Sequence, residues 1–352
     1  MDSVLDSSWV ARFPRTRYQG SKRKHAAAIV DQLRDMSFTT VLDAFGGTGA
    51  VAYAFKRAGK RVTYNDLLVF NHQIGLALIE NDSVRLIDQE IAAIGERRIG
   101  LAYGDFIERT FAGVYFTNDE NRWLDTAGGN ISRMTCRYKR ALAWFAVFQA
   151  AMAKRPYNLF HRANLYMRTA DVPRSFGNKA GWDRPFEDHL RAFAAEANEA
   201  VFNGPQPCRA MCRDALEIDP VFDLVYIDTP YINRNRVGVD YRAFYHFLEG
   251  MVRYDDWPDL IDRGFKHLPL RRKAHPWSDA SACHAAFRVL FERFRDSQLV
   301  VSYRSEGIPS IDELVRILRH MKKKVRIVDL DRRPYALSTN SRSSETLLVA
   351  AD

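Results

Sequence analysis

Residues 40–49 read Thr-Val-Leu-Asp-Ala-Phe-Gly-Gly-Thr-Gly, and this stretch decides the fold. Its apolar, β-branched beginning predicts a buried strand that ends in polar residues. Gly46, Gly47 and Gly49 then predict a tight turn into a helix, because glycine adopts positive φ angles and lets the backbone approach a ligand closely. The turn is not the dinucleotide fingerprint, since Ala52 stands where that motif needs its last glycine. From this stretch alone, a ligand-binding loop and a plain strand-to-helix connection both stay open.

Other short β-rich runs recur along the chain between helical stretches. They cover residues 61–66, 208–212, 222–228, 298–303, 324–330 and 345–350, and a helix is expected over residues 311–322. The set predicts an α/β fold with a doubly wound, Rossmann-like sheet, in which ligands bind at the carboxyl ends of the strands. Asp43, Asp66 and Asp228 stand at that edge or beside it. Asp66 follows Gly49 at the spacing where such folds place an acid on ribose hydroxyls, which favours a nucleoside-containing cofactor.

The spacing of these runs predicts two domains. More than 150 residues separate Asp66 from Asp228, far more than one helix and two short loops require. We predict a catalytic domain over residues 1–79 plus 204–352 and an inserted, mainly helical domain over residues 80–203. The apolar run over residues 141–153 is shorter than the ~20 residues of a membrane span and predicts a buried helix. Trp257 and Trp277 are interpreted as core or loop packing.

The overall charge indicates a polyanionic partner. The 352 residues include 52 Lys and Arg against 43 Asp and Glu, a net charge of +9, and nucleic acid is the usual partner for such an excess. The chain begins without the basic and apolar regions of a secretory signal, which favours a cytoplasmic location. Four scattered cysteines fit a reduced compartment. They are interpreted as buried apolar residues, and no metal site is predicted because no ligand pairs stand at suitable spacing.

Basic residues concentrate in the predicted insert. Residues 126–170 contain eight Lys and Arg and no Asp or Glu. Phosphate binding needs unpaired cations of this kind. The candidate DNA-binding residues are Arg133, Arg137, Lys139, Arg140, Arg162 and Arg168. A basic face that is merely solvated is the alternative, and the same two interpretations apply to a hairpin expected around residues 332–342.

Three motifs in a fixed order resemble a known family. Arg17-Tyr18-Gln19-Gly20-Ser21-Lys22 comes first, the glycine turn second, and Asp228-Thr229-Pro230-Tyr231 third, after the apolar run over residues 224–227. Over roughly residues 15–350 the chain resembles the DNA adenine methylase (Dam-like) family of S-adenosylmethionine-dependent methyltransferases. The stretch Tyr241-x-x-x-Tyr245-His246-Phe247-Leu248-Glu249 is similar to members from restriction-modification systems. The resemblance implies a prokaryotic or phage-encoded, site-specific enzyme that methylates the 6-amino group of adenine in duplex DNA.

The resemblance also implies roles for individual residues. Tyr18, Gly20 and Lys22 would touch the cofactor or the base. The turn with Asp43, Phe45, Gly46, Gly47 and Gly49 would line the methionine moiety of S-adenosylmethionine. Asp66 would hold the ribose, Asp214 would reach the adenine amine of the cofactor, and the insert would recognise the DNA target. The catalytic residues would be Asp228, Thr229, Pro230 and Tyr231, although most family members have proline where this chain has Thr229.

The tetrapeptide suits methylation of an exocyclic amine. Such an amine is a poor nucleophile because its lone pair is delocalised into the ring. Asp228 and the backbone carbonyl of Thr229 can accept both N–H bonds and direct that lone pair toward the methyl donor. Tyr231 would stack on a base flipped out of the duplex, because the amine is unreachable inside it. Pro230 still restrains the Thr229 carbonyl, so we expect activity to survive the departure at residue 229.

Four alternatives stay open from the sequence. Methylation of the cytosine 4-amino group needs the same geometry. An RNA base methyltransferase is a weaker alternative, because such chains seldom need so large an insert between the cofactor and catalytic strands. A catalytically weak DNA-binding relative would explain Thr229 as decay. A nicotinamide-dependent dehydrogenase would explain the sheet but neither the tetrapeptide nor the basic insert. A cognate restriction endonuclease is a possible functional partner, and the sequence sets neither an oligomeric state nor a recognition site.

Overall fold

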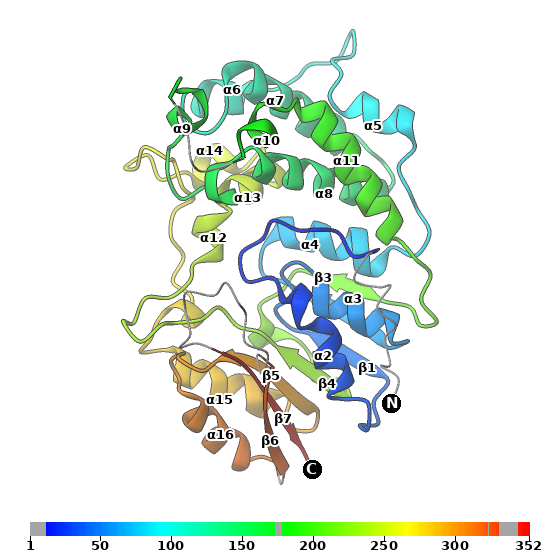
Figure 1. Ribbon diagram of the computed structural model, residues 1–352, viewed down its shortest axis with the longest axis vertical. Helices are drawn as coiled ribbons and strands as arrows, with labels where there is room; N and C mark the ends of the chain where they lie inside the picture. The colour runs from blue at the N-terminus through cyan, green and yellow to red at the C-terminus, as the bar shows by residue number, and fades with distance from the viewer. Residues whose placement is uncertain (1–11, 173–177, 323, 331–343) are drawn as a thin grey trace.

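A seven-stranded sheet occupies the lower part of the computed structural model in Figure 1, which describes residues 12–172, 178–322, 324–330 and 344–352. The strands are β1 Thr40–Asp43, β2 Arg61–Asn65, β3 Arg209–Met211, β4 Leu224–Ile227, β5 Gln298–Arg304, β6 Lys324–Asp329 and β7 Glu345–Ala351. They lie in the order β3-β2-β1-β4-β5-β7-β6. β1 to β5 pair in parallel, and β7 pairs antiparallel with both β5 and β6.

The predicted strands are confirmed to within a few residues at each end. The strand order reverses between β1 and β4, and this reversal is the point where doubly wound sheets bind ligands. Asp43 ends β1 and Asp228 follows β4 directly, so the reversal brings the acids of the second and third motifs to one place. The hairpin expected around residues 332–342 lies outside the described residues. Cys208 and Cys283 are buried as expected, whereas Cys212 is exposed, so the interpretation of that thiol as buried was wrong.

Helices cover both faces of the sheet. On one face lie η1 Lys22–Lys24, α2 Ala26–Asp31 and α3 Ala50–Arg57, and on the other lie η4 Ala215–Glu217, η5 Pro276–Ser278, α15 Cys283–Arg293 and α16 Ile311–Arg319. Successive residues of each central strand pack into different cores. Val41 and Tyr226 belong to the core beneath α3, whereas Leu42 and Val225 belong to the core beneath α15 and α16. Burial on both faces explains why these strands are continuously apolar in sequence.

A layer of helices lies above the sheet in Figure 1. Between β2 and β3 it contains α4 Val69–Gly75, η2 Leu76–Glu80, α5 Asp88–Ile94, α6 Phe106–Thr110, α7 Asn118–Ser132, α8 Arg137–Ala153, η3 Pro156–Asn158, α9 Tyr166–Thr169, α10 Lys179–Asp183 and α11 Phe186–Ala200. A second chain segment enters the same layer after β4. Its helices are α12 Tyr241–Phe244, α13 His246–Val252 and α14 Trp257–Leu260. The second segment packs on the first, since the Trp257 ring lies 5.0 Å from the Phe111 ring and 5.5 Å from the Phe106 ring, measured between centroids.

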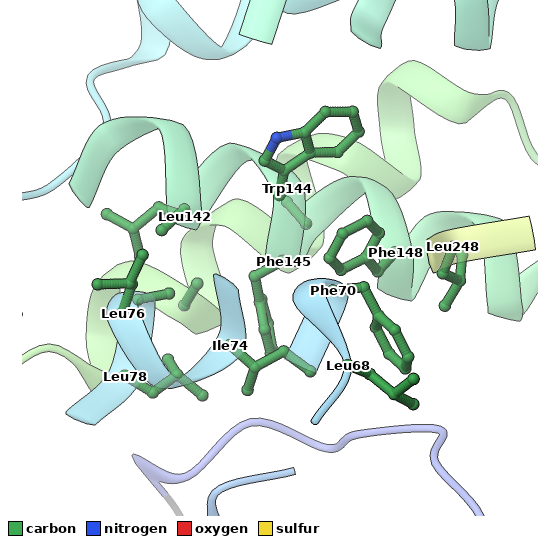
Figure 2. Close-up of a cluster of buried hydrophobic side chains, with 14 of the residues drawn as sticks. Leu68, Phe70, Ile74, Leu76, Leu78, Leu142, Trp144, Phe145, Phe148 and Leu248 are labelled. Atoms are coloured by element: carbon green, nitrogen blue, oxygen red, sulfur yellow. The ribbon is translucent and has the colours of Figure 1, made fainter. Parts of the chain in front are cut away.

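The core between α8 and the α4–η2 run lies within the helical layer, and α4 and η2 also pack against β3 of the sheet. Figure 2 shows Phe70, Ile74 and Leu76 facing Phe145 and Phe148 of α8 across this interface. Every residue of the predicted helix over 141–153 is buried, as expected. Within the part of the chain that the structure describes, no helix combines the length and apolarity needed to cross a bilayer. The division into residues 1–79 plus 204–352 and residues 80–203 stays a prediction.

Candidate active site

A cleft of about 410 Å³ opens at the carboxyl edge of the sheet, beside the strand-order reversal. This volume is within the range of roughly 300–1,000 Å³ that small-molecule sites occupy. All three motifs contribute to its lining, together with segments that the sequence did not single out. The lining includes Tyr18, Gly20, Lys22, Asp43, Phe45, Gly46, Gly47, Asp66, Asp214, Asp228, Thr229, Pro230, Tyr241, Lys273, His275 and Trp277.

Contacts with Tyr64 fix one side of the glycine turn, and the other side of the turn faces the cleft. Gly47 and Gly49 have φ angles of +51° and +75°, which favour glycine. A Cβ atom on Gly46 would lie 2.1 Å from the Tyr64 ring, so only glycine fits there. The Tyr64 hydroxyl donates a hydrogen bond to the Gly47 carbonyl at 2.7 Å. The turn is therefore fixed from below while its other side faces the cleft.

Asp43 and Asp66 place two carboxylates beneath this turn. Asp66 accepts the Gly47 N–H at Oδ2 and the Leu68 N–H at Oδ1, both at 2.9 Å, so it holds the turn against the start of α4. Asp43 is 1% exposed, and its Oδ1 atom has no hydrogen-bond partner among the described residues. Burial and the neighbouring charges of Asp228 and Asp66 raise the pKa of Asp43 well above its ordinary value. An unpartnered carboxylate oxygen at a cleft is a natural acceptor for a ligand's donor.

Aromatic rings and Asp214 form the opposite end of the cleft. The rings of Phe45 and Trp277 meet edge to face with centroids 5.2 Å apart. Trp277 is buried, as the sequence suggested, but it also lines the cleft, and sequence reasoning missed this second role. Asp214 caps η4 by accepting the Leu216 N–H at 3.0 Å and lines the cleft beside them. No motif marks the His275-Pro276-Trp277 loop, so only the fold reveals its position.

Lys22, Asp228, Tyr231 and Glu345 form a buried network on the other side of the cleft. The Nζ atom of Lys22 lies 2.8 Å from Asp228 Oδ1 and 3.3 Å from Glu345 Oε1. The Tyr231 hydroxyl donates to Asp228 Oδ1 at 2.7 Å, lies 3.2 Å from Glu345 Oε1 and also contacts Lys22 Nζ. Glu345 is the first residue of β7, and its role was missed because the sequence marks it only as a strand residue. Antiparallel β7 starts at the edge where the parallel strands end, which delivers Glu345 to the site.

The network sets the charges of its members. Burial raises the pKa of Asp228, Lys22 opposes that rise, and the charge of Glu345 adds to it. Burial by itself would lower the pKa of Lys22, but Asp228 and Glu345 outweigh it and hold the pKa above the ordinary value. Lys22 therefore stays a cation between two carboxylates. Burial also raises the pKa of Tyr231 well above its usual range, so its hydroxyl keeps its proton.

The Tyr231 ring is not placed to stack on a base in the cleft. Asp228, Thr229 and Pro230 line the cleft, but Tyr231 is not among its lining residues. Its hydroxyl is held by the buried network, and its ring meets the Tyr303 ring edge to face at 5.5 Å. Thr229 is 2% exposed, and its hydroxyl has no hydrogen-bond partner among the described residues.

Tyr18 and Gly20 connect the first motif to α12 and α13. The Tyr18 ring stacks between the rings of Tyr241 and Tyr245, at 5.4 and 4.4 Å between centroids. Gly20 has a φ angle of +82°, and a Cβ atom there would lie 2.5 Å from the Tyr241 hydroxyl. The first motif and the Tyr241–Tyr245 stretch thus form one wall of the cleft, although more than 200 residues separate them in sequence.

The candidate DNA-binding cations do not form one free basic face. Arg168 is 6% exposed and pairs with Glu120 at 2.7 Å, so the expectation that it is a free surface cation was wrong. The acids that pair with these cations come from outside the basic run, which is why the sequence count missed them. Arg137 pairs with Glu80, and Lys139 pairs with Glu90.

The remaining three candidates differ in location. Arg133 is exposed and donates to backbone carbonyls of Gly129 and Ala102, and Arg140 donates to the Met134 carbonyl at 3.4 Å. Both flank the start of α8. Exposed Arg162 follows His161, whose ring lies 5.8 Å from the Phe244 ring of α12, so Arg162 is close to the cleft wall.

The start of α8 is remote from the cleft. α4 begins at the cleft with Val69 and continues through η2 to Glu80, the partner of Arg137. Twelve helical residues span roughly 18 Å. The cations near the start of α8 therefore stand about that far from the end of α4 that lines the cleft.

The chain is similar in sequence to known DNA methyltransferases. The family model described as D12 class N6 adenine-specific DNA methyltransferase matches residues 18–317. The Type II methyltransferase M2.HphI of Haemophilus parahaemolyticus is 27% identical over 326 residues, which cover 90% of this chain and 91% of that protein. The modification methylase StsI of Streptococcus sanguinis is 26% identical over 91% of this chain and 48% of its own length. The Type II methyltransferase M.FokI of Planomicrobium okeanokoites is 24% identical over 86% of this chain, which spans about half (46%) of that protein.

Proposed function

Because the chain belongs to the D12 class of N6 adenine-specific DNA methyltransferases, we propose that its cleft binds S-adenosylmethionine and that Asp228 holds the adenine to be methylated. The chain is an adenine-specific DNA methyltransferase of the kind found among Type II modification methylases. The observation that carries the detailed assignment is the position of Asp228, which lines the cleft at the strand-order reversal beside the glycine turn.

The described residues suit S-adenosylmethionine as the ligand of the cleft. When bound, this cofactor supplies an electrophilic methyl group on a sulfonium cation. The cleft offers the unpartnered Oδ1 atom of Asp43 to a donor and presents three carboxylates, Asp43, Asp66 and Asp228, to a positive charge. The Phe45 and Trp277 rings offer an apolar face for a nucleobase, with Asp214 beside them as an acceptor for its amine. Asp66 can still accept a ribose hydroxyl, because each carboxylate oxygen has a second lone pair.

Asp228 and the Thr229 backbone prepare the target amine. Among the described residues, the hydrogen bonds and ion pairs of Asp228 use Oδ1, so Oδ2 can accept one N–H of the 6-amino group. The Thr229 carbonyl accepts the other N–H, and the lone pair then points toward the methyl donor. Lys22 holds Asp228 in a fixed orientation before substrate arrives, which reduces the reorganisation needed at the moment of reaction.

Base flipping brings the adenine to this position. The amine cannot reach the cleft while its base is stacked in a duplex. For Tyr231 to stack on the flipped base, its hydroxyl has to leave Asp228 and Lys22, so the ring moves when DNA binds. Arg162 is the insert cation best placed to contact the nearby phosphates, and the inserted helices over residues 80–203 recognise the target sequence. A cognate restriction endonuclease is the functional partner that the modification-methylase relatives suggest.

Methyl transfer with labelled cofactor tests the proposal. The protein is incubated with radiolabelled S-adenosylmethionine and mixed-sequence duplex DNA, and the DNA is then digested to nucleosides. We expect label in N6-methyladenine, and we expect Asp228→Ala to lose at least about a thousandfold in kcat while it still binds the cofactor. Label in 4-methylcytosine would overturn the base assignment. Full activity of Asp228→Ala would overturn the mechanism, and structured RNA as the substrate gives the matched negative control.

A further inference from the structure

Residues 261–273, here called the basic strap, follow α14 and lie outside both the predicted insert and the catalytic tetrapeptide. The first part is a hairpin closed by the bridge between Ile261 and Leu270, and the rest is a segment without regular secondary structure that leads to Lys273 in the cleft lining. The cations of the strap are Arg263, Lys266, Arg271, Arg272 and Lys273. Asp262 is its single acid, and Asp262 Oδ1 accepts the Gly264 N–H at 2.9 Å.

The strap cations differ from three of the six candidate cations of the insert, because those three are ion-paired. All five are exposed, and within the described ranges no carboxylate lies within 4.0 Å of any of their side-chain nitrogens. By contrast, Arg137, Lys139 and Arg168 of the insert are ion-paired. Unpaired cations can replace the counterions of a phosphate backbone, whereas paired cations first have to give up a partner. The strap therefore carries more available positive charge than the acid-free run that the sequence emphasised.

The position of the strap links the helical layer to the cleft. The Tyr115 hydroxyl, inside the helical layer, donates to the His267 carbonyl at 2.6 Å, and six residues later Lys273 lines the cleft. In Figure 1 the hairpin after α14 projects to the left, on the same side as the loop between β4 and α12. That second loop follows the catalytic tetrapeptide and carries exposed Arg234 and Arg236. Both loops project to the same side in this view, and Lys273 of the strap and Val239 of the second loop line the cleft.

We propose that the basic strap binds the phosphate backbone of duplex DNA next to the target adenine, an inference that rests on the proposed function. Contacts of this kind fix the register of a protein on DNA and supply the sequence-independent part of its affinity. Phe265 is 52% exposed between Gly264 and Lys266 at the tip of the hairpin. An apolar ring among phosphate-binding cations can contact sugars or enter the base stack beside an extruded nucleotide. The DNA then runs past the strap and Arg162, and the start of α8 lies outside its path.

Salt-dependent DNA binding by paired variants tests the strap. The probes are the double variants Arg263→Ala/Lys266→Ala and Arg271→Ala/Arg272→Ala, with Arg137→Ala/Lys139→Ala as the matched control from the remote end of α8. Dissociation constants for a fluorescent duplex are measured over a series of salt concentrations. Each strap variant should weaken binding about tenfold and reduce the slope of log affinity against log salt by about 2, one per cation. The control should keep the wild-type slope.

The outcomes separate the strap from the proposed function. A wild-type slope in both strap variants, or a reduced slope only in the α8 control, overturns the strap as the DNA contact. Failure of the wild-type protein to methylate adenine, together with reduced slopes in the strap variants, overturns the proposed function but leaves the strap as a DNA-binding surface. Unchanged melting temperatures and cofactor affinities show that the variants are folded.

Discussion

Asp228 and Glu345 share Lys22 and Tyr231, which makes Glu345 the residue most able to influence Asp228, the proposed catalytic carboxylate, from outside the cleft. The Oε1 atom of Glu345 contacts the Lys22 ammonium at 3.3 Å and accepts the Ser302 hydroxyl at 2.6 Å. Glu345 is not among the residues that line the cleft. We therefore expect it to act as a positioning residue that keeps Lys22 and Tyr231 in place around Asp228.

Replacing Glu345 by Gln should lower kcat and change its pH dependence. The charge of Glu345 is one cause of the raised pKa of Asp228, so its removal lowers that pKa. Asp228 must be ionised to accept an amine N–H, and it then stays ionised to lower pH. The acid limb of the kcat profile should move to lower pH, while kcat near neutrality falls about tenfold because Lys22 loses a partner.

A purely structural role of Glu345 would lower kcat without moving the acid limb. Ser302→Ala loosens Glu345 without removing its charge, so it should reduce kcat and leave the limb where it is. Glu292→Gln removes an exposed glutamate that pairs with Arg295, and it should change neither quantity. An unchanged kcat and an unchanged limb in Glu345→Gln would contradict the assignment.

Replacing Thr229 by Val should leave methylation nearly intact. The proposed role of this residue belongs to its backbone carbonyl, and its buried hydroxyl has no hydrogen-bond partner among the described residues. Removing an unpartnered hydroxyl of the same shape is nearly neutral or stabilising. We expect kcat within about twofold of wild type and a melting temperature that is equal or higher. A loss of kcat beyond about tenfold would show that the hydroxyl itself takes part.

At the scale of elements, Glu120 at the start of α7 joins parts of the helical layer that are distant in sequence. It lies 2.7 Å from Arg168 at the end of α9 and 2.9 Å from Lys154 just after α8, and both cations are nearly fully buried. Burial would raise the pKa of Glu120, but hydrogen bonds and charge from Arg168, helped by Lys154, outweigh it and lower the pKa. Arg168, a candidate DNA-binding residue in the sequence, and Lys154 are thus structural.

Stability should fall as Glu120 is protonated. Because the pKa of Glu120 is lowered on folding, its contribution is present above the unfolded value of ~4.3 and is lost as pH falls through the folded value. Glu120→Gln should remove roughly 3 kcal/mol from the free energy of unfolding at neutral pH, since it leaves two buried cations without their partner. The variant should also show a weaker loss of stability between about pH 6 and pH 3 than the wild type.

Urea unfolding at several pH values measures this effect. Glu108→Gln is the matched control, because Glu108 pairs with Arg122 in an exposed bridge whose contribution is about 0–1 kcal/mol. If Glu120→Gln and Glu108→Gln lowered the free energy of unfolding equally, the buried ion pairs of Glu120 would stabilise the layer no more than an exposed bridge does.

The sequence was sufficient for elements whose signal is local. Continuous apolar runs that end in Asp43 or Asp228 mark buried parallel strands, and the glycines beside them mark the turn. The sequence was not sufficient to predict contacts between residues that lie on distant segments of the chain. Nothing near Arg168 points to Glu120, and nothing near Glu345 points to Lys22, because each pair forms only when separate elements pack. Trp277 shows a third case, in which an apolar signal correctly predicts burial but cannot show that one edge of the ring faces a cleft.

At the scale of the whole molecule, the sheet and the helical layer should unfold together. One continuous core runs from Val41 and Tyr226 in the sheet through Ile74 in α4 to Phe145 in α8 and Trp257 in α14. Separating the layers would leave a cavity or expose apolar surface. The free-energy cost of doing so would exceed the small net stability of a folded protein. We expect one cooperative transition in which far-ultraviolet circular dichroism and tryptophan fluorescence report the same midpoint. Two separated midpoints would favour an insert over residues 80–203 that folds on its own.

The place of β7 also has a consequence for protein synthesis. Lys22 and Glu345 stand more than 300 residues apart and meet only because β7 enters between β5 and β6. A nascent chain can form the glycine turn and all five parallel strands on the ribosome, yet it lacks the final acidic member of the lysine network. Full methylation competence therefore waits for the synthesis of β7, which follows that of the basic strap.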